Sequence, residues 1–206
     1  MISFTTSRAF PFERLALALN SELPADVSIR NVEIVSGGFS ARFSACERTY
    51  VYALFNRPQR CALLARSATH VYRPLDLNAM CAAAQALLGE HDFRSFCGML
   101  PEGGVTIRRV FALELERRGE FIRMQISASG FLHRMVRTIA GTLIECGTGR
   151  RDPSTMLAIL AARRRSAAGL TAPPQGLYLA GVRYDDGYNS YREPPIFALS
   201  DAAVLP

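Results

Sequence analysis

The stretch from residue 107 to residue 149 constrains the fold most strongly, because it combines two different periodicities. Residues 107–130, IRRVFALELERRGEFIRMQISASG, alternate as two strands do, with Arg118-Gly119 between them, which predicts an antiparallel hairpin. Residues 129–149, SGFLHRMVRTIAGTLIECGTG, carry apolar side chains at helical spacing and predict an amphipathic helix. A hairpin followed by such a helix indicates a helix packed on an antiparallel sheet.

The rest of the chain has the same mixture of strand and helix patterns. Strands are predicted over residues 2–6, 27–35, 48–56 and 176–184, and helices over residues 11–24, 76–93 and 153–165. Asp76 is the predicted N-cap of the second of these helices, and Gly89 is its predicted stop. We therefore expect an α+β fold in which helices cover a mostly antiparallel, mixed sheet.

Charge indicates the class of partner. All 24 residues counted as Lys+Arg are arginine, and the formal net charge is +6. Guanidinium groups bind phosphate oxygens bidentately, so the arginines favour a polyanionic partner such as RNA. GC-rich coding, which replaces lysine by arginine without a functional reason, is an equally good explanation of the missing lysine.

The cysteines and the hydropathy pattern bear on the compartment. The chain has five cysteines, an odd number, without Cys-x-x-Cys spacing, which is typical of reduced thiols in a cytoplasmic protein. The sequence contains no apolar run long enough to span a membrane and no signal-peptide core near Met1. It also contains no spacing typical of a metal site, no Gly-rich phosphate loop and no nucleophile elbow, which disfavours a generic metabolic enzyme.

Two groups of side chains are candidates for contact with RNA. Tyr50 lies in a predicted strand beside Arg48, so its ring can stack on a base while the arginine binds a phosphate. The alternative is an ordinary half-buried strand tyrosine. Arg163, Arg164 and Arg165 end a predicted helix, where they form either an RNA-contacting edge or a solvated C-terminus that complements the helix dipole.

Arg137 lies at the edge of the apolar stripe of the helix predicted over residues 129–149. A charge in that position needs solvent or a partner, because an unpaired buried charge is costly. The side chain therefore either extends to solvent or forms an ion pair with a carboxylate in a cleft. No carboxylate in this sequence has an obvious claim to that second role.

Four segments, taken in order, resemble the bacterial tRNA pseudouridine synthase A family. They are FSARFSACERTYVYALFN, HDFRSF, GFLHRMVRTIAGTLIECGTG and APPQGLYLAGVRY. The resemblance implies isomerisation of uridine to pseudouridine at positions 38 to 40 of the tRNA anticodon arm, without cofactor or metal. It also implies a pseudouridine synthase fold of two related α/β halves, and a homodimer.

The resemblance implies roles for three residues. Tyr50, in RTYVY, matches the tyrosine that packs against the target base, and Leu177, in GLYL, matches the apolar residue that lines the uracil pocket. Arg137, in MVRTIAG, matches the arginine that pairs with the catalytic aspartate. That aspartate belongs to an Arg-Thr-Asp-Ala-Gly motif, which is absent from this sequence.

The family's aspartate motif precedes the strand that residues 2–6 resemble, so we expect an N-terminally truncated synthase. On this view residues 1–36 are the remnant of the N-terminal α/β half, residues 37–185 form the C-terminal synthase domain, and residues 186–206 are an irregular tail. The chain by itself is then an inactive fragment of the enzyme. The alternative is a noncatalytic RNA-binding module.

Overall fold

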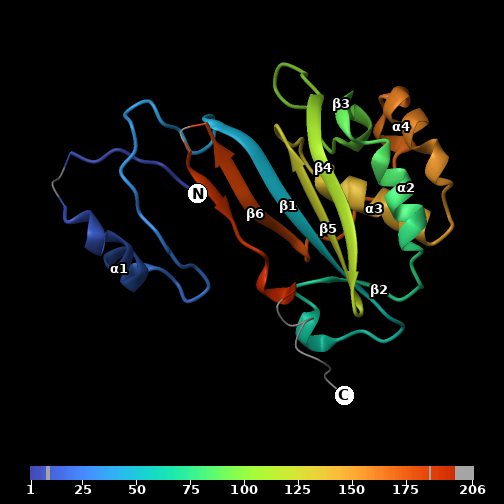
Figure 1. The fold of residues 1–206 in the computed structure, drawn as a ribbon, viewed down its shortest axis with the longest axis horizontal. Coiled ribbons are helices and arrows are strands. Elements are labelled where there is room, and N and C mark those ends of the chain that lie inside the picture. Colours follow the sequence, from blue (N-terminus) through green and yellow to red (C-terminus); the bar gives the residue numbers. More distant parts are fainter. Residues whose placement is uncertain (8–9, 186, 198–206) are drawn as a thin grey trace. The chain divides into compact units, whose positions relative to one another are not determined.

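A computed structural model describes residues 1–7, 10–185 and 187–197 of the chain. The chain divides into two compact units, residues 1–45 and residues 46–206 (Figure 1). The first unit contains helix α1 (Phe12–Glu22), which confirms the helix predicted over residues 11–24.

The strands predicted in the first unit are wrong. Residues 2–6 and 27–35 form no strand in the structure. Ile29 instead makes both of its backbone hydrogen bonds with the side chain of Asn20, each 2.7 Å long. Alternation of apolar and polar residues gives a segment two faces, but a strand also needs a neighbouring strand for its N–H and C=O groups.

The second unit is built on one sheet. Its seven described strands have the order β3-β4-β5-β1-β6-β7, with β2 paired to β1 outside that path. The strands are β1 (Ala45–Asn56), β2 (Thr69–Val71), β3 (Gly89–Asp92), β4 (Ile107–Arg118), β5 (Phe121–Ala128), β6 (Leu177–Tyr184) and β7 (Asn189–Tyr191). The pair β1–β2 is parallel, whereas β1–β5, β3–β4, β4–β5 and β6–β7 are antiparallel. The predicted α+β fold with a mostly antiparallel, mixed sheet is confirmed.

The hairpin is also confirmed. Strands β4 and β5 pair with Arg118 opposite Phe121, so Gly119 and Glu120 make the two-residue turn that the sequence predicts. Such a short turn fixes which side chains of the two strands lie on the same face of the sheet.

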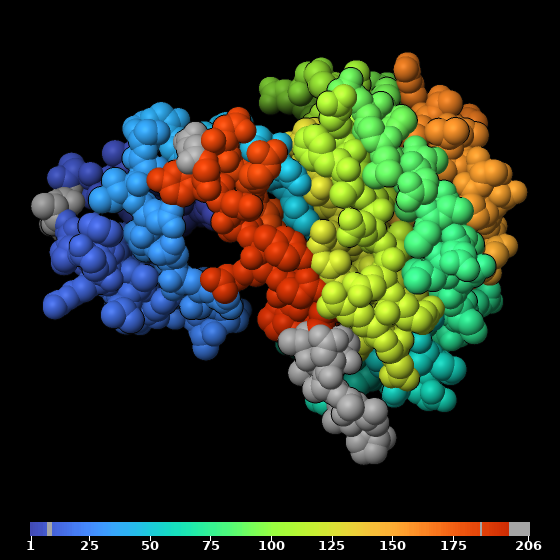
Figure 2. Space-filling view, viewed as in Figure 1, coloured from blue at the N-terminus to red at the C-terminus, as the bar shows by residue number. Residues whose placement is uncertain are grey.

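Helices cover one face of this sheet (Figure 1). They are α2 (Leu77–Gln85), α3 (Met135–Gly147) and α4 (Met156–Ala162), with the 3₁₀ helices η2 (Phe93–Phe96), η3 (Pro153–Thr155) and η4 (Arg165–Ala167). A further 3₁₀ helix, η1 (Ala62–Leu64), lies between β1 and β2, and its Leu64 packs against the apolar cluster that contains Phe55. Figure 2 shows the green atoms of α2 and the orange atoms of the chain around α4 on the same side of the unit, and α2 contacts α3 and η3 there. Asp76 caps α2 as predicted, through hydrogen bonds from the N–H groups of Asn78 and Ala79.

Alternate residues of β1 point to opposite faces of the sheet. Tyr52 and Leu54 belong to the larger core cluster, which includes residues from α2, α3 and α4, and Tyr50 packs against it. We call this the helix face. Val51, Ala53 and Phe55 belong to a smaller cluster, on the side that we call the opposite face.

The largest differences between the predicted and observed helix boundaries are in α3 and α2. Helix α3 begins at Met135 rather than near residue 129, and Arg134 before it has a left-handed backbone, with φ 61°. The Ser129 N–H donates to the Arg109 carbonyl, and the His133 carbonyl accepts from the Gly98 N–H. These backbone groups are therefore hydrogen-bonded to other segments and not within a helix. Helix α2 ends at Gln85 rather than at Gly89, which begins β3.

The C-terminal segment, predicted to be irregular from residue 186, is more ordered than expected over part of its length. Residues 189–191 form β7, which pairs with β6, and Ile196 and Phe197 are buried in the cluster on the opposite face. Strand β7 is only three residues long, so its sequence pattern is too short to predict a strand. It is ordered because it pairs with β6, which already belongs to the sheet. Residues 198–206 lie outside the described residues.

All five cysteines are free thiols. None of the helices in residues 1–7, 10–185 and 187–197 has the length and hydropathy needed to cross a bilayer.

Candidate functional site

Tyr50 lies on β1 and is half-buried on the helix face. Its ring meets the edge of Phe131, with ring centroids 5.1 Å apart and an interplanar angle of 86°. Burial raises the pKa of the Tyr50 hydroxyl, and the nearby Arg48 charge lowers it by less. The phenol is therefore protonated at neutral pH, and it offers an aromatic surface with a hydrogen-bonding tip.

Arg137 lies in the first turn of α3 and is half-buried. Its Nε donates to the Ala172 carbonyl at 2.7 Å, and the Ala172 N–H donates back to the Arg137 carbonyl at 3.0 Å. This pair of bonds fixes the direction of the guanidinium. Neither predicted alternative describes it fully: in the part of the chain that the structure describes, no carboxylate forms an ion pair with Arg137.

Leu177 is the first residue of β6 and is half-buried. Its side chain packs against the core cluster of the helix face, as Tyr50 does. Its N–H donates to the Pro174 carbonyl at 3.2 Å, so the chain turns sharply just before the strand. The structure therefore brings Tyr50, Arg137 and Leu177 to one side of the sheet, from three different elements.

The segment from Ala172 to Leu177, which we call the bridging segment, joins α3 to the sheet. Beyond its bond to Arg137, its Gly176 carbonyl accepts from the Ala53 N–H at 2.8 Å. Its Gln175 carbonyl accepts from Thr69 Oγ1 at 2.6 Å. The segment is therefore held both by α3 and by strands β1 and β2.

Tyr52 is the residue at this site that the sequence did not indicate. Its hydroxyl lies 2.6 Å from Thr69 Oγ1 and donates to the Pro173 carbonyl of the bridging segment at 2.7 Å. Burial raises the pKa of Tyr52 to about 12, although Thr69 and the Arg137 charge lower it. Tyr52 follows Tyr50 by two residues in a strand, so it faces the same side, and this spacing is the signal that marks it.

Helix α3 and the chain before the bridging segment approach closely at Gly141. A Cβ atom at this position would lie 1.8 Å from the Leu170 carbonyl oxygen, so any larger residue would push the two apart. The Gly169 N–H donates to Thr142 and the Leu170 N–H donates to Glu145, at 3.0 and 3.1 Å. These contacts hold the bridging segment in register with Arg137.

The predicted RNA-binding arginines have different surroundings. Arg48 donates to the Ser129 carbonyl at 2.8 Å, close to Tyr50. Arg163 is largely exposed and pairs with Asp92 at 3.2 Å. Arg164 is exposed. Arg165 turns back and donates to Thr171 Oγ1 at 2.9 Å, just before the bridging segment. Arg48 therefore lies with the candidate site, whereas Arg163 and Arg164 extend from the end of α4.

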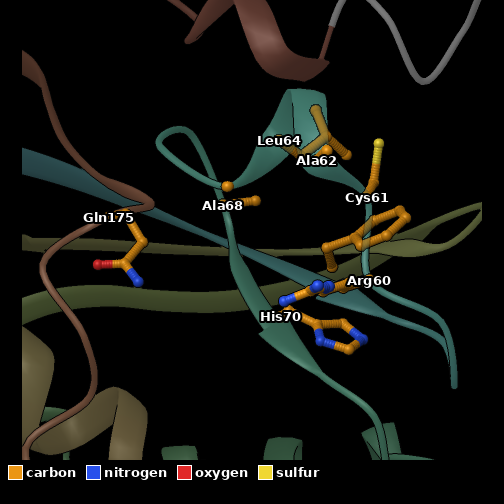
Figure 3. Close-up of a pocket in the computed structure, with 9 residues that line it drawn as sticks. Arg60, Cys61, Ala62, Leu64, Ala68, His70 and Gln175 are labelled. Atoms are coloured by element: carbon orange, nitrogen blue, oxygen red, sulfur yellow. The ribbon is translucent and has the colours of Figure 1, made fainter.

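A separate pocket of about 390 Å³ opens beside the loop between β1 and β2. It is lined by Phe55, Arg60, Cys61, Ala62, Leu64, Ala65, Ala68, His70 and Gln175. Figure 3 shows Gln175 on one side of this pocket and Arg60 and His70 on the other. Its Phe55 wall belongs to the opposite face, so this pocket is distinct from the site around Tyr50.

The arrangement on the helix face suits recognition of a base and a carboxylate. A neutral aromatic ring and an aliphatic side chain provide a surface for a planar base. A guanidinium fixed through Nε keeps its terminal nitrogens for a planar anionic partner. Among the described residues, no group of three His, Cys, Asp or Glu side chains is arranged to hold a metal ion.

Comparison with known proteins identifies the family of the chain. A family model described as tRNA pseudouridine synthase matches residues 83–185. The chain is similar to proteins named tRNA pseudouridine synthase A. The one from Yersinia pseudotuberculosis is 40% identical over 203 residues, which cover 98% of this chain and 77% of that protein.

Two further relatives carry the same name. The protein from Caldicellulosiruptor bescii is 42% identical over 182 residues, covering 88% of this chain and 75% of its own length. The protein from Methylococcus capsulatus is 44% identical over 177 residues, covering 86% of this chain and 65% of its own length. With identity at this level along nearly all of its length, the chain belongs to the tRNA pseudouridine synthase family.

Proposed function

We propose that this chain takes part in the isomerisation of uridine to pseudouridine at positions 38 to 40 of the tRNA anticodon arm. The enzymes of its family are isomerases that act on tRNA. The observation that carries the proposal for this chain is the grouping of Tyr50, Arg137 and Leu177 on one side of the sheet.

Each of these residues has a proposed role. Tyr50 packs against the target base, which its aromatic ring and protonated hydroxyl suit. Leu177 lines the uracil pocket with an apolar surface. Arg137 orients a catalytic aspartate and keeps it ionised, because a nearby positive charge lowers the pKa of a carboxylate. Arg48, Arg163, Arg164 and Arg165 are proposed contacts to the RNA backbone.

The proposed chemistry needs the aspartate as nucleophile. Its carboxylate attacks the sugar carbon C1′ as the N1–C1′ glycosidic bond breaks. The freed uracil then rotates, its C5 displaces the carboxylate from C1′, the C5 proton is lost to solvent and N1 takes up a proton. The Arg-Thr-Asp-Ala-Gly motif that carries the aspartate in the family does not occur among the 206 residues. We therefore expect the 206-residue chain by itself to bind tRNA without turning it over.

Further parts of the proposal concern organisation. We propose that residues 1–36 belong to an N-terminal α/β half, and that residues 37–185 form the C-terminal synthase domain. We also propose that the protein works in the cytoplasm as a homodimer on the anticodon stem-loop.

Binding and tritium release test the proposal together. The substrate is a tRNA transcript with [5-³H]uridine, and the matched control has cytidine at positions 38 to 40. We expect the folded chain to bind tRNA, with affinity that falls steeply from about 50 mM to about 200 mM salt because counterions are released. Tritium release is expected at background.

Two outcomes would contradict the proposal in different ways. A folded chain that fails to bind tRNA at low salt would remove the proposed substrate. Release of tritium by the pure chain would mean that the nucleophile lies within the 206 residues. Binding that never leads to turnover, even with the aspartate motif supplied, would favour the noncatalytic RNA-binding module.

A further inference from the structure

The loop from Ser129 to Arg134 connects β5 to α3 and touches several parts of the second unit. Its Ser129 carbonyl accepts the hydrogen bond from Arg48, and its Phe131 ring meets Tyr50. Its Ser129 N–H donates to the Arg109 carbonyl at 3.0 Å. The loop is therefore fixed at its N-terminal end, directly beside the candidate base-stacking residue.

Basic side chains surround this loop. A Cβ atom at Gly130 would lie 3.5 Å from Arg108 Nε, so the Arg108 side chain passes over the loop. A Cβ atom at Gly98 would lie 3.1 Å from His133 Nδ1 and 3.1 Å from Arg134 Cδ, so both of these side chains lie against Gly98. We call Arg48, Arg108, His133 and Arg134 the loop cluster.

Several arginines of the second unit are paired with carboxylates. Arg57, Arg123, Arg151, Arg163 and Arg183 each form an ion pair with a carboxylate. Arg108, His133 and Arg134 form none with any residue that the structure describes, and His133 and Arg134 are exposed. Basic side chains beside an aromatic ring are the combination that single-stranded nucleic acids bind.

The backbone of Arg134 adds to this argument. Its φ of 61° lies in the left-handed region, which is unfavourable for a residue with a Cβ atom and free for glycine. Glycine would therefore be the easier residue if this position only had to turn the chain into α3. The position holds a long charged side chain instead, and strained residues of this kind concentrate at functional sites.

We propose that the loop cluster binds backbone phosphates of the RNA strand whose base packs on Tyr50. The inference rests on the proposed function, namely that the chain acts on tRNA. Stacking of a base on Tyr50 brings the phosphates on either side of that nucleotide to the end of β5, where the loop cluster lies. The arginine forks bind these phosphates as charge-assisted hydrogen-bond donors.

Substitutions at Arg134 test this inference in the 206-residue chain. Arg134→Ala removes the charge and keeps the backbone conformation unfavourable, whereas Arg134→Gly removes both. The control is Arg150→Ala, which removes the same charge from an exposed residue just beyond the other end of α3, a helix of 13 residues that is about 20 Å long at about 1.5 Å per residue. The probe is a 17-nucleotide anticodon stem-loop RNA, and its dissociation constant is measured at several salt concentrations.

We expect both Arg134 variants to bind the stem-loop about three- to tenfold more weakly than the parent. The slope of log affinity against log salt concentration should become shallower by about one, which is the contribution of one phosphate contact. Arg150→Ala should bind within about twofold of the parent. Arg134→Gly should melt at or above the temperature of the parent, so that its weaker binding cannot be explained by unfolding.

The outcomes separate this inference from the proposed function. If the parent binds RNA and both Arg134 variants bind as well as Arg150→Ala, the loop cluster is not a phosphate site, while the proposed function stands. If the parent itself fails to bind the stem-loop and tRNA at low salt, both are overturned.

Discussion

The two faces of the sheet in the second unit are closed in different ways. On the helix face, α2, α3 and α4 bury a continuous apolar cluster, and Tyr50, Arg137 and Leu177 lie at its edge. The opposite face has a smaller apolar cluster, which includes Ile196 and Phe197 of the C-terminal segment.

A buried charge completes the opposite face. Arg123 of β5 is only 8% exposed, and it donates to Glu193 at 2.7 Å and to Tyr191 at 2.6 Å. Arg118 also pairs with Glu193, at 3.3 Å. The C-terminal segment is therefore held to the sheet by hydrogen-bonded charges as well as by apolar contacts.

The stability of the two faces should therefore respond to different changes. Apolar packing depends on shape and little on pH, so the face that carries the candidate site keeps its geometry over a wide range of conditions. An ion pair around a buried arginine depends on the ionisation of its partner. We expect the opposite face to respond to pH and the helix face to respond to changes in side-chain volume.

The largest effect is expected from a cavity on the helix face. Leu160→Ala, in α4, removes a side chain that is 6% exposed and should lower the free energy of unfolding by about 2–4 kcal/mol. Leu157→Ala makes the same change on the same helix at a side chain that is 60% exposed, and should change it by less than about 0.5 kcal/mol. Urea denaturation followed by circular dichroism measures both. Equal losses would mean that α4 does not pack as described.

A smaller effect is expected from the ion pair on the opposite face. Glu193→Gln leaves Arg123 buried without a negative partner and should cost about 1–2 kcal/mol, less than for a fully buried pair because Glu193 is partly exposed. Glu116→Gln is the control, since its carboxylate also pairs with Arg118 but is 52% exposed, and it should cost less than about 0.5 kcal/mol. Chemical denaturation at pH 7 compares the two variants. No difference between them would show that the Arg123–Glu193 ion pair does not help to hold the C-terminal segment.

The smallest effect is the dependence of this ion pair on pH. Burial by itself would raise the pKa of Glu193, but hydrogen bonds from Arg123 and Tyr191 and the arginine charges lower it below its ordinary value. A lowered pKa in the folded state stabilises the fold above the unfolded pKa of about 4.3, and this contribution is lost as the pH falls through the folded value.

The difference in unfolding free energy between the parent and Glu193→Gln should therefore shrink as the pH is lowered from about 6 to about 3. Asp92, whose pKa is also lowered, is present in both proteins and cancels in the difference. Denaturation curves at several pH values measure it. A difference that is constant over this range would contradict the proposed role of Glu193.

The sequence predicted the local parts of the fold well. The hairpin turn at Gly119 and the Asp76 cap each depend on residues close together in the chain, and both are confirmed. Strands that depend on distant partners were predicted less well. The two strands expected in the first unit are not formed, whereas β2 and β7, three residues each, were not predicted and pair with β1 and β6.

The candidate site was predicted only in part. Tyr50 and Arg137 were singled out from the sequence itself, Leu177 was selected by resemblance to a family, and the position of all three on one face could not be derived from spacing. Arg137 is oriented by the hydrogen bond that its Nε donates to the backbone carbonyl of Ala172. Every residue has a backbone carbonyl, so the sequence does not show which one accepts this bond. Tyr52 was missed because an alternating strand gives the same signal for a core tyrosine and for one that binds a neighbouring segment.

The proposal that the helix face carries a pseudouridine synthase site is tested most directly by pseudouridine formation at position 39 of tRNA. The chain is joined at Met1 to a segment that carries the family's Arg-Thr-Asp-Ala-Gly motif, and single-turnover rates are measured with Arg137 and with Arg137→Ala, beside tRNA dissociation constants. We predict that the parent forms pseudouridine, and that Arg137→Ala lowers the rate more than about 100-fold, or about 2.7 kcal/mol, while tRNA binding changes less than threefold. Arg137→Lys should recover only part of the rate, because a point charge lacks the planar fork. A rate for Arg137→Ala within about threefold of the parent, a difference of about 0.65 kcal/mol, would contradict the account.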